Sequence, residues 1–215
     1  MHRDPGGVAP DSNVRRFSAD ANISLVGEIE ARRELAAEGW LTINTNSEKR
    51  NYPNVDLLSI RGSETRAIQV KTTNAESGSH KHCLYLGRAE GWLTKEMPFF
   101  NAKVGPICAN IVVLVHARRE RSRFVVLPVS VAESLARSFV KEWYEIKKLD
   151  GASRSAGFDA RIPFTKLPTN PRPIERSAHE TLINYENRWD ILDFSVLELQ
   201  DPTKWNLTDE RTQPH

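Results

Sequence analysis

Two short segments decide the fold: 55–60 (VDLLSI) and 66–73 (RAIQVKTT). Both are rich in Val, Ile and Thr, the residue types that favour extended strands. The link between them, 61–65 (RGSET), is polar and contains Gly62. Two β-rich segments around a glycine-containing link predict an antiparallel hairpin.

The alternation of side chains along the second strand separates two kinds of residue. Gln69 and Lys71 share one face of the strand, and Ile68 and Val70 share the other. Asp56 on the first strand is expected roughly opposite Val70, within cross-strand reach of Gln69 and Lys71. This placement depends on the register of the hairpin, because a slip of one residue would reverse the faces.

A helix is predicted before the hairpin, at 22–38, with Asp20 or Asn22 as its cap and Gly39 at its end. Successive residues turn by about 100° around a helix. Glu28 is then expected within or beside an apolar arc, and three other glutamates are expected on the solvent face. The arc contains Leu25, Ile29, Leu35 and Ala36, and the solvent face contains Glu30, Glu34 and Glu38. Glu28 therefore needs a cation, a basic partner or a water-filled cleft.

The rest of the chain alternates further strands and helices. Strands are predicted at 40–44, 83–86, 110–116 and 123–127, and helices at 88–96, 129–149 and 178–192, the last as one helix or two short segments. The segment 150–173 is rich in Gly, Ser, Pro and Arg and is expected to be irregular. This order predicts an α/β fold, a mixed central sheet flanked by helices. The expected organisation is a flexible tail at 1–20, a core at 21–150, a C-terminal extension docked on the core at 151–200 and a flexible tail at 201–215.

The polar residues of the hairpin and the helix fit one chemistry. Mg²⁺ prefers hard oxygen ligands. Asp56 offers a carboxylate, Gln69 an amide carbonyl, and Glu28 a carboxylate that binds directly or through water. A metal ion at this site would polarise a phosphodiester and lower the pKa of its bound water. Lys71 would orient the attacking water or stabilise charge on the phosphorus.

This arrangement resembles the PD-(D/E)XK nuclease superfamily, whose fold is restriction-endonuclease-like. The resemblance rests on Glu28 in an early helix, Asp56 at the start of the hairpin, and Gln69-Val70-Lys71 in its second strand. It is specific over about 25–73. It is weaker at 124–128 and at 185–190, which looks like a tail segment of uncharacterised bacterial members. Val55 replaces the proline of the motif, and Gln69 replaces the usual Asp or Glu, which removes one negative charge from the metal site.

The resemblance implies a Mg²⁺- or Mn²⁺-dependent endonuclease that hydrolyses DNA, for example in defence, recombination or repair. Glu28, Asp56, Gln69 and Lys71 are the implied catalytic residues, and the first three are the implied metal ligands. Such nucleases often act as homodimers. One alternative is a catalytically weak or inactive module with the same fold that binds DNA or a protein partner. Another is a hydrolase whose substrate is not a nucleic acid.

Basic residues outside the hairpin are candidates for contact with DNA. Arg118, Arg119 and Arg121, with Arg123, form a cluster in a predicted turn. They would contact phosphates or simply lie in a solvated hairpin tip. His80 and Lys81 are candidates as part of a basic loop near the backbone. The run at 80–83 (HKHC) also suggests zinc, but further ligands are not evident in the sequence.

Composition sets the outer limits. The chain has 215 residues, 39% hydrophobic and 27% charged, with a net charge of +2. This balance is compatible with nucleic-acid binding without arguing for it. Cys83 and Cys108 are too few for a disulfide framework. The sequence has no secretory signal and no apolar run long enough to span a bilayer, so a cytoplasmic protein without membrane contact is expected.

Overall fold

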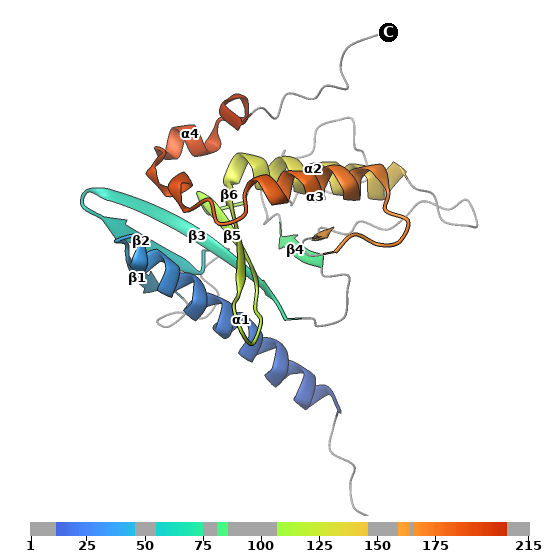
Figure 1. Ribbon diagram of the computed structural model, residues 1–215, viewed down its shortest axis with the longest axis horizontal. Coiled ribbons are helices and arrows are strands. Elements are labelled where there is room, and N and C mark those ends of the chain that lie inside the picture. The colour runs from blue at the N-terminus through green and yellow to red at the C-terminus, as the bar shows by residue number, and fades with distance from the viewer. Residues whose placement is uncertain are drawn as a thin grey trace, which may run out of the picture.

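The computed structural model describes residues 12–45, 55–74, 81–85, 107–145, 159–163 and 166–205 (Figure 1). Side chains are described for 23–45, 55–74, 107–139, 142 and 166–205. The predicted helix at 88–96 and the candidate residue His80 lie outside the described residues. Lys81 is the first residue of a strand, and its side chain is outside them as well.

A five-stranded mixed sheet forms the centre, in the order β1-β2-β3-β5-β6. Its strands are β1 Leu41–Asn44, β2 Leu57–Arg61, β3 Glu64–Thr73, β5 Ile111–His116 and β6 Arg123–Pro128. β3 and β5 are parallel, and every other neighbouring pair in this sheet is antiparallel. Helices cover both faces, so the predicted α/β class with a mixed, helix-flanked sheet is confirmed.

The two faces of the sheet carry different elements. One face is covered by α1 Ser12–Ala37, the short helix η2 Trp189–Asp193 and α4 Val196–Gln200. The other carries α2 Val129–Glu145 and α3 Pro173–Asn184. A separate two-stranded sheet, β4 Lys81–Tyr85 with β7 Asp159–Pro163, packs against α2 and β3. A last short helix, η3 Pro202–Trp205, follows α4.

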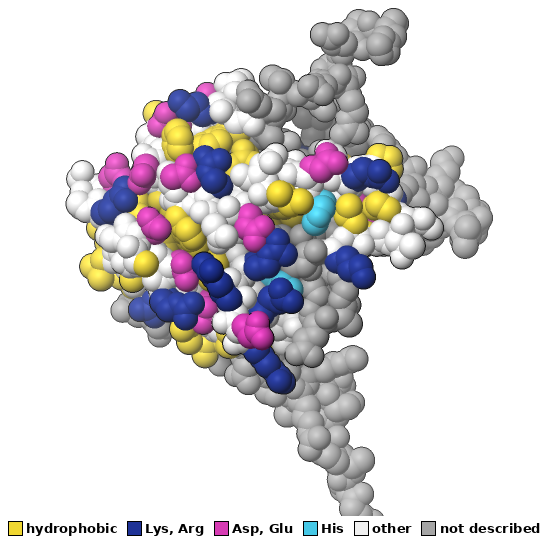
Figure 2. All heavy atoms as spheres, viewed as in Figure 1, with side chains coloured by type: hydrophobic (Ala, Val, Ile, Leu, Met, Phe, Trp, Pro, Cys, Tyr) yellow, Lys and Arg dark blue, Asp and Glu magenta, His cyan; other side chains and the backbone are white. Residues whose placement is uncertain are grey.

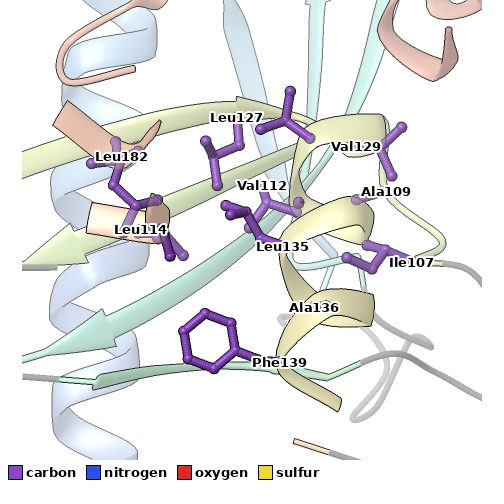
Figure 3. Packing of buried hydrophobic residues seen from close by; sticks show 14 of the residues in the cluster. Ile107, Ala109, Val112, Leu114, Leu127, Val129, Leu135, Ala136, Phe139 and Leu182 are labelled. Atoms are coloured by element: carbon purple, nitrogen blue, oxygen red, sulfur yellow. The ribbon is translucent and has the colours of Figure 1, made fainter. Parts of the chain in front are cut away.

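The core under α2 explains the apolar segments of β5 and β6. Val112 and Leu114 point toward α2, and Leu135 and Phe139 of that helix pack over them, with Leu182 of α3 beside them (Figure 3). Val113 and Val115 lie on the opposite face, in the cluster that contains α1. Both faces of β5 are therefore buried, which is why its sequence is continuously apolar rather than alternating.

α1 uses a different face from the one predicted. Its buried positions are Gly27, Ala31 and Leu35, while Leu25 and Ile29 are 50% and 53% exposed. The predicted apolar arc around Leu25 and Ile29 is wrong. Small side chains at Gly27 and Ala31 let the helix backbone approach the sheet closely, and this packing outweighs the burial of larger side chains elsewhere on the helix.

Several element boundaries also differ from the prediction. α1 begins at Ser12, so residues 12–20, assigned to a tail, are helical. β7 lies within 150–173, where irregular structure was predicted. The local sequence does not favour a strand there, since its five residues include Pro163, and the strand forms because it pairs with β4. α3 begins five residues earlier than predicted because Pro173 is favoured in the first turn of a helix. No helix among the described residues is long and apolar enough to cross a membrane.

The C-terminal segment 166–205 is fastened to the sheet by a buried arginine. Arg66 on β3 is 4% exposed and donates hydrogen bonds to the carbonyl oxygens of Leu192 (3.0 Å) and Phe194 (2.7 Å). Its guanidinium also lies 5.5 Å from the centre of the Trp40 ring. Trp189 packs on Phe124, with ring centres 5.5 Å apart. These contacts tie the end of the chain to its first hairpin.

Candidate functional site

The site is built where the β2–β3 hairpin opens. Leu57 of β2 pairs with Ile68 of β3, and this is the last pair of the ladder. β3 continues to Thr73, and among the described residues nothing pairs with it on this side beyond Ile68. We call this opening the fork.

Asp56 lies at the base of the fork. Its backbone N–H donates to the Ile68 carbonyl at 2.9 Å, and its carboxylate Oδ2 accepts the backbone N–H of Val70 at 2.8 Å. Extending the register places Asp56 opposite Gln69, one residue from the expected position opposite Val70. The carboxylate is therefore held at the edge of β3, immediately beside the candidate residues of that strand.

Gln69 and Lys71 share a face of β3, as predicted. They pair in register with Val112 and Leu114, which face α2. Gln69 is 0% exposed, and neither its amide oxygen nor its amide nitrogen has a hydrogen-bond partner in the described part of the protein. A buried amide without partners costs free energy of the order of 1–3 kcal/mol, which a ligand or metal at this position would recover. Lys71 is half-buried.

Glu28 approaches the fork from the face that carries α1. The Asn44 side-chain nitrogen Nδ2, at the end of β1, donates to Glu28 Oε2 at 2.6 Å. The preceding residue, Gly27, abuts Thr72 of β3. Glu28 is thus held between the end of β1 and the far half of β3, the two strands on either side of Asp56.

The four candidate residues therefore lie around the fork, but on different sides of β3. Asp56 lies at its edge, and Gln69 and Lys71 extend from the face toward α2. Glu28 lies over the opposite face. No cluster of three or more His, Cys, Asp or Glu residues suited to a metal occurs among the described residues. An oxygen site at the fork would accordingly combine two carboxylates with the Gln69 carbonyl.

Gly27→Ala is expected to destabilise the protein and to displace Glu28. A β-carbon at position 27 would lie 1.8 Å from Thr72 Oγ1 and 2.8 Å from Thr72 Cβ. Overpacking of this kind costs about 1–3 kcal/mol, of which the better helix propensity of alanine returns about 1 kcal/mol. Urea unfolding measures the loss. Adding Thr72→Ala removes the nearest clashing atom and should restore part of the stability; a double variant no more stable than Gly27→Ala would contradict this packing.

A second feature lies beyond the end of β3. A groove of about 960 Å³ runs along the turn between β5 and β6, from Val26 of α1 and Asn74 to the C-terminal segment. Its lining includes the three candidate arginines Arg118, Arg119 and Arg121, all exposed. Lys and Arg side chains gather over the lower end of the β5–β6 hairpin in Figure 2. The predicted basic turn is therefore one wall of a groove rather than an isolated tip.

The other wall of this groove was missed by the sequence analysis. Glu186 pairs with Arg123 through two hydrogen bonds of 2.7 Å, one to each carboxylate oxygen. The pair holds the pKa of Glu186 below its ordinary value and raises that of Arg123. Asn187, which also lines the groove, has a positive φ of 55°. Asn tolerates this conformation better than most residues, and an Asn within a polar segment was an available sequence signal, beside the resemblance noted at 185–190.

Comparisons with known proteins do not identify a family for this chain. No known family profile matches the chain, and no curated protein matches its sequence. One similar solved structure is a bacterial homing endonuclease, I-Ssp6803I, with a TM-score of 0.45 and 13% identity over 80% of this chain and 91% of that chain. Another is MepB, with a TM-score of 0.32 and 8% identity over 68% and 83% of the two chains. Both likenesses are too distant to carry an argument about activity.

Proposed function

We propose that this protein is a metal-dependent endonuclease that hydrolyses DNA phosphodiester bonds at the fork. The observation that carries the proposal is the buried amide of Gln69, which has no hydrogen-bond partner in the described part of the protein. Asp56, anchored on the Val70 N–H, is the residue that the extended register places opposite Gln69. Buried polar groups are almost always hydrogen-bonded, and an exception calls for an explanation such as a catalytic role or a bound water or ion.

The donor set at the fork fits a hard divalent cation. Asp56, the Gln69 carbonyl and Glu28 would hold Mg²⁺ or Mn²⁺, which take oxygen ligands and keep several waters. When bound, the cation would polarise the phosphate and lower the pKa of a ligated water. The Asp56–Val70 hydrogen bond fixes one carboxylate oxygen, and the Asn44–Glu28 hydrogen bond orients the second carboxylate. Both acids are thus positioned by neighbouring backbone and side-chain groups before any ion arrives.

Lys71 supplies the remaining charge. It lies two residues from Gln69 on the same face of β3, so its ammonium group projects along that face. There it would stabilise negative charge on the phosphate or orient the water that attacks it. An ordered strand, rather than a loop, sets the spacing between the amide and the ammonium, which favours a fixed geometry.

The experiment that tests the proposal is cleavage of circular and branched DNA in Mg²⁺ or Mn²⁺ by the wild type and by Asp56→Ala. Wild-type cutting that requires the metal and is lost in Asp56→Ala supports the nuclease. Cutting that survives in Asp56→Ala, or that is unchanged in EDTA, would reject the fork as its site.

The lack of charge on Gln69 favours a second candidate function, a module that binds DNA or a protein without cutting. A neutral amide replaces a carboxylate at the position that the motif reserves for an acid, so the site attracts a cation less strongly. A wild type that binds DNA and never cuts it, with binding tolerant of Asp56→Ala and Lys71→Ala, would select this alternative.

Gln69→Glu is expected to tighten Mg²⁺ binding by at least about tenfold, or 1.4 kcal/mol. Without metal the same change places a carboxylate where the side chain is fully buried, and the protein should unfold more easily. Thermal unfolding with and without Mg²⁺ measures both effects. Gln69→Leu is the matched control, because it keeps the approximate size and offers no ligand. If Mg²⁺ raised the melting temperature of Gln69→Glu no more than that of Gln69→Leu, position 69 would not face the metal.

A further inference from the structure

We propose that the groove beside the fork binds the sugar-phosphate backbone of the DNA strand next to the cleaved bond, and that Glu186 withholds Arg123 from this contact. The inference deepens the proposed function and rests on it for the identity of the substrate. Three arginines, Arg118, Arg119 and Arg121, would contact phosphate, and Glu186 would keep Arg123 from being a fourth.

Three parts of the chain form the groove. Val26 of α1 and Asn74 after β3 lie at one end, and residues 116–123 of the β5–β6 hairpin form one wall. Glu186 and Asn187 form the other wall, because the segment 185–187 adds to the free edge of β6. The Val126 N–H donates to the Tyr185 carbonyl, and the Asn187 N–H donates to the Phe124 carbonyl, each at 3.0 Å. Backbone hydrogen bonds therefore fix both walls.

The arginines of the groove are in two different states. Arg118, Arg119 and Arg121 are exposed and make no hydrogen bond or ion pair with another described residue. Arg123 has its guanidinium committed to Glu186 through two bonds. Three guanidinium groups are therefore free for a ligand, while the fourth is neutralised within the protein.

The lining favours phosphate over a protein surface. Among the described lining residues only Val26 and Ala117 are apolar, whereas protein interfaces depend on buried aromatic and aliphatic anchors. Guanidinium groups match phosphate oxygens in bidentate geometry. Asn74 and Asn187 add neutral amides, the kind of side chain that contributes many phosphate contacts.

The position of the groove matches a strand that continues from the fork. Asn74 lies three residues beyond Lys71, one residue past the end of β3, which is about 10 Å at 3.3 Å per residue. Successive nucleotides of one DNA strand advance by about 3.4 Å along the helix axis. The near end of the groove is therefore about three nucleotides from the phosphate at Lys71, so the arginines would contact the flanking backbone and not the cleaved bond.

The first test measures binding of a 20-base-pair duplex in EDTA, where cleavage cannot occur, as salt is varied. Each phosphate contact contributes about −0.9 to the slope of log affinity against log salt. The triple variant Arg118→Ala, Arg119→Ala, Arg121→Ala should bind more weakly and reduce the magnitude of the slope by about 2.7. The matched control is Arg33→Ala, Arg137→Ala, Arg176→Ala, which removes the same charge at exposed arginines outside the groove and should leave the slope within one contact of wild type.

The second test removes the Glu186 carboxylate that pairs with Arg123. Glu186→Gln should release Arg123 to a phosphate, tighten binding several-fold at low salt and increase the magnitude of the slope by about 0.9. Thermal unfolding in the same buffer establishes that the variant is folded. A folded Glu186→Gln variant with unchanged affinity and slope would remove Glu186 from the proposal.

The outcomes separate this inference from the proposed function. Arginine-dependent binding of DNA by a wild type that never cuts would support the groove and reject the nuclease. Equal slopes for the groove triple variant and its control would overturn the groove, even if cleavage is observed. Equal loss of poly-glutamate and DNA binding in the groove variant would also overturn it, since the surface would then be a general anion site.

Discussion

Lys71→Ala is expected to lower the rate of metal-dependent DNA cleavage by about 10²- to 10³-fold. The change removes the one cationic side chain that shares a face of β3 with Gln69, and loss of a single preorganised stabilising group typically has an effect of this size. Single-turnover cleavage at saturating enzyme isolates the chemical step from binding. Because Lys71 is one of many charges that would attract DNA, duplex binding in EDTA should change by less than tenfold.

The matched control for this change is Lys166→Ala, which removes an exposed lysine ahead of α3. It should leave both the single-turnover rate and the thermal unfolding unchanged. Lys71→Arg keeps the charge but alters its position, and an intermediate rate would show that placement matters. If Lys71→Ala cut DNA at the wild-type rate while remaining folded, the assignment of this residue to the site would be wrong.

Arg66→Ala is expected to reduce the free energy of unfolding by about 3–5 kcal/mol. The guanidinium of Arg66 is 4% exposed and donates to the carbonyl oxygens of Leu192 and Phe194. Its removal leaves two acceptors and the Trp40 ring without their partner, and hydrogen bonds from charged donors contribute about 1.5–3 kcal/mol each. Urea unfolding monitored by tryptophan fluorescence measures the change.

Arg66→Lys tests why an arginine is needed. A single ammonium group cannot reach both carbonyls with the geometry of a guanidinium fork, so this variant should recover less than half of the loss. Arg33→Ala, at an exposed arginine on α1, should change the stability by less than about 0.5 kcal/mol. A loss below 1 kcal/mol in Arg66→Ala would show that the C-terminal segment is held by its apolar contacts alone.

The hairpin and its neighbouring strands could be predicted because they depend on local pattern. β-branched residues favour the two strands, and Gly62 favours the turn between them. The alternation of side chains along β3 correctly separates Gln69 and Lys71 from Ile68 and Val70. The register was predicted one residue away because it depends on which residue ends the ladder. That point is set by Asp56, whose carboxylate takes the Val70 N–H instead of leaving it to a further strand pair.

Other features depend on contacts between distant segments and could not be read locally. The orientation of α1 follows from the close approach of Gly27 to Thr72, which no periodicity of large side chains reveals. β7 exists because β4 pairs with it across 74 or more residues. Glu186 acquires its role only through Arg123, 63 residues earlier in the chain. The assignment of Glu28, Asp56, Gln69 and Lys71 to a catalytic site remains a prediction.

The hydrogen bonds from Arg66 to the C-terminal segment have a consequence for the synthesis of the chain. The Leu192 carbonyl lies 126 residues downstream of Arg66. At translation rates of about 5–20 residues per second, some 6–25 seconds separate the emergence of donor and acceptor from the ribosome. During that interval the Arg66 guanidinium of the nascent hairpin lacks the carbonyl acceptors of Leu192 and Phe194, so water must solvate it instead. Docking of the segment 185–205 on the hairpin therefore follows the synthesis of Phe194, and a chain that stops before Leu192 would leave the Arg66 guanidinium without these two acceptors.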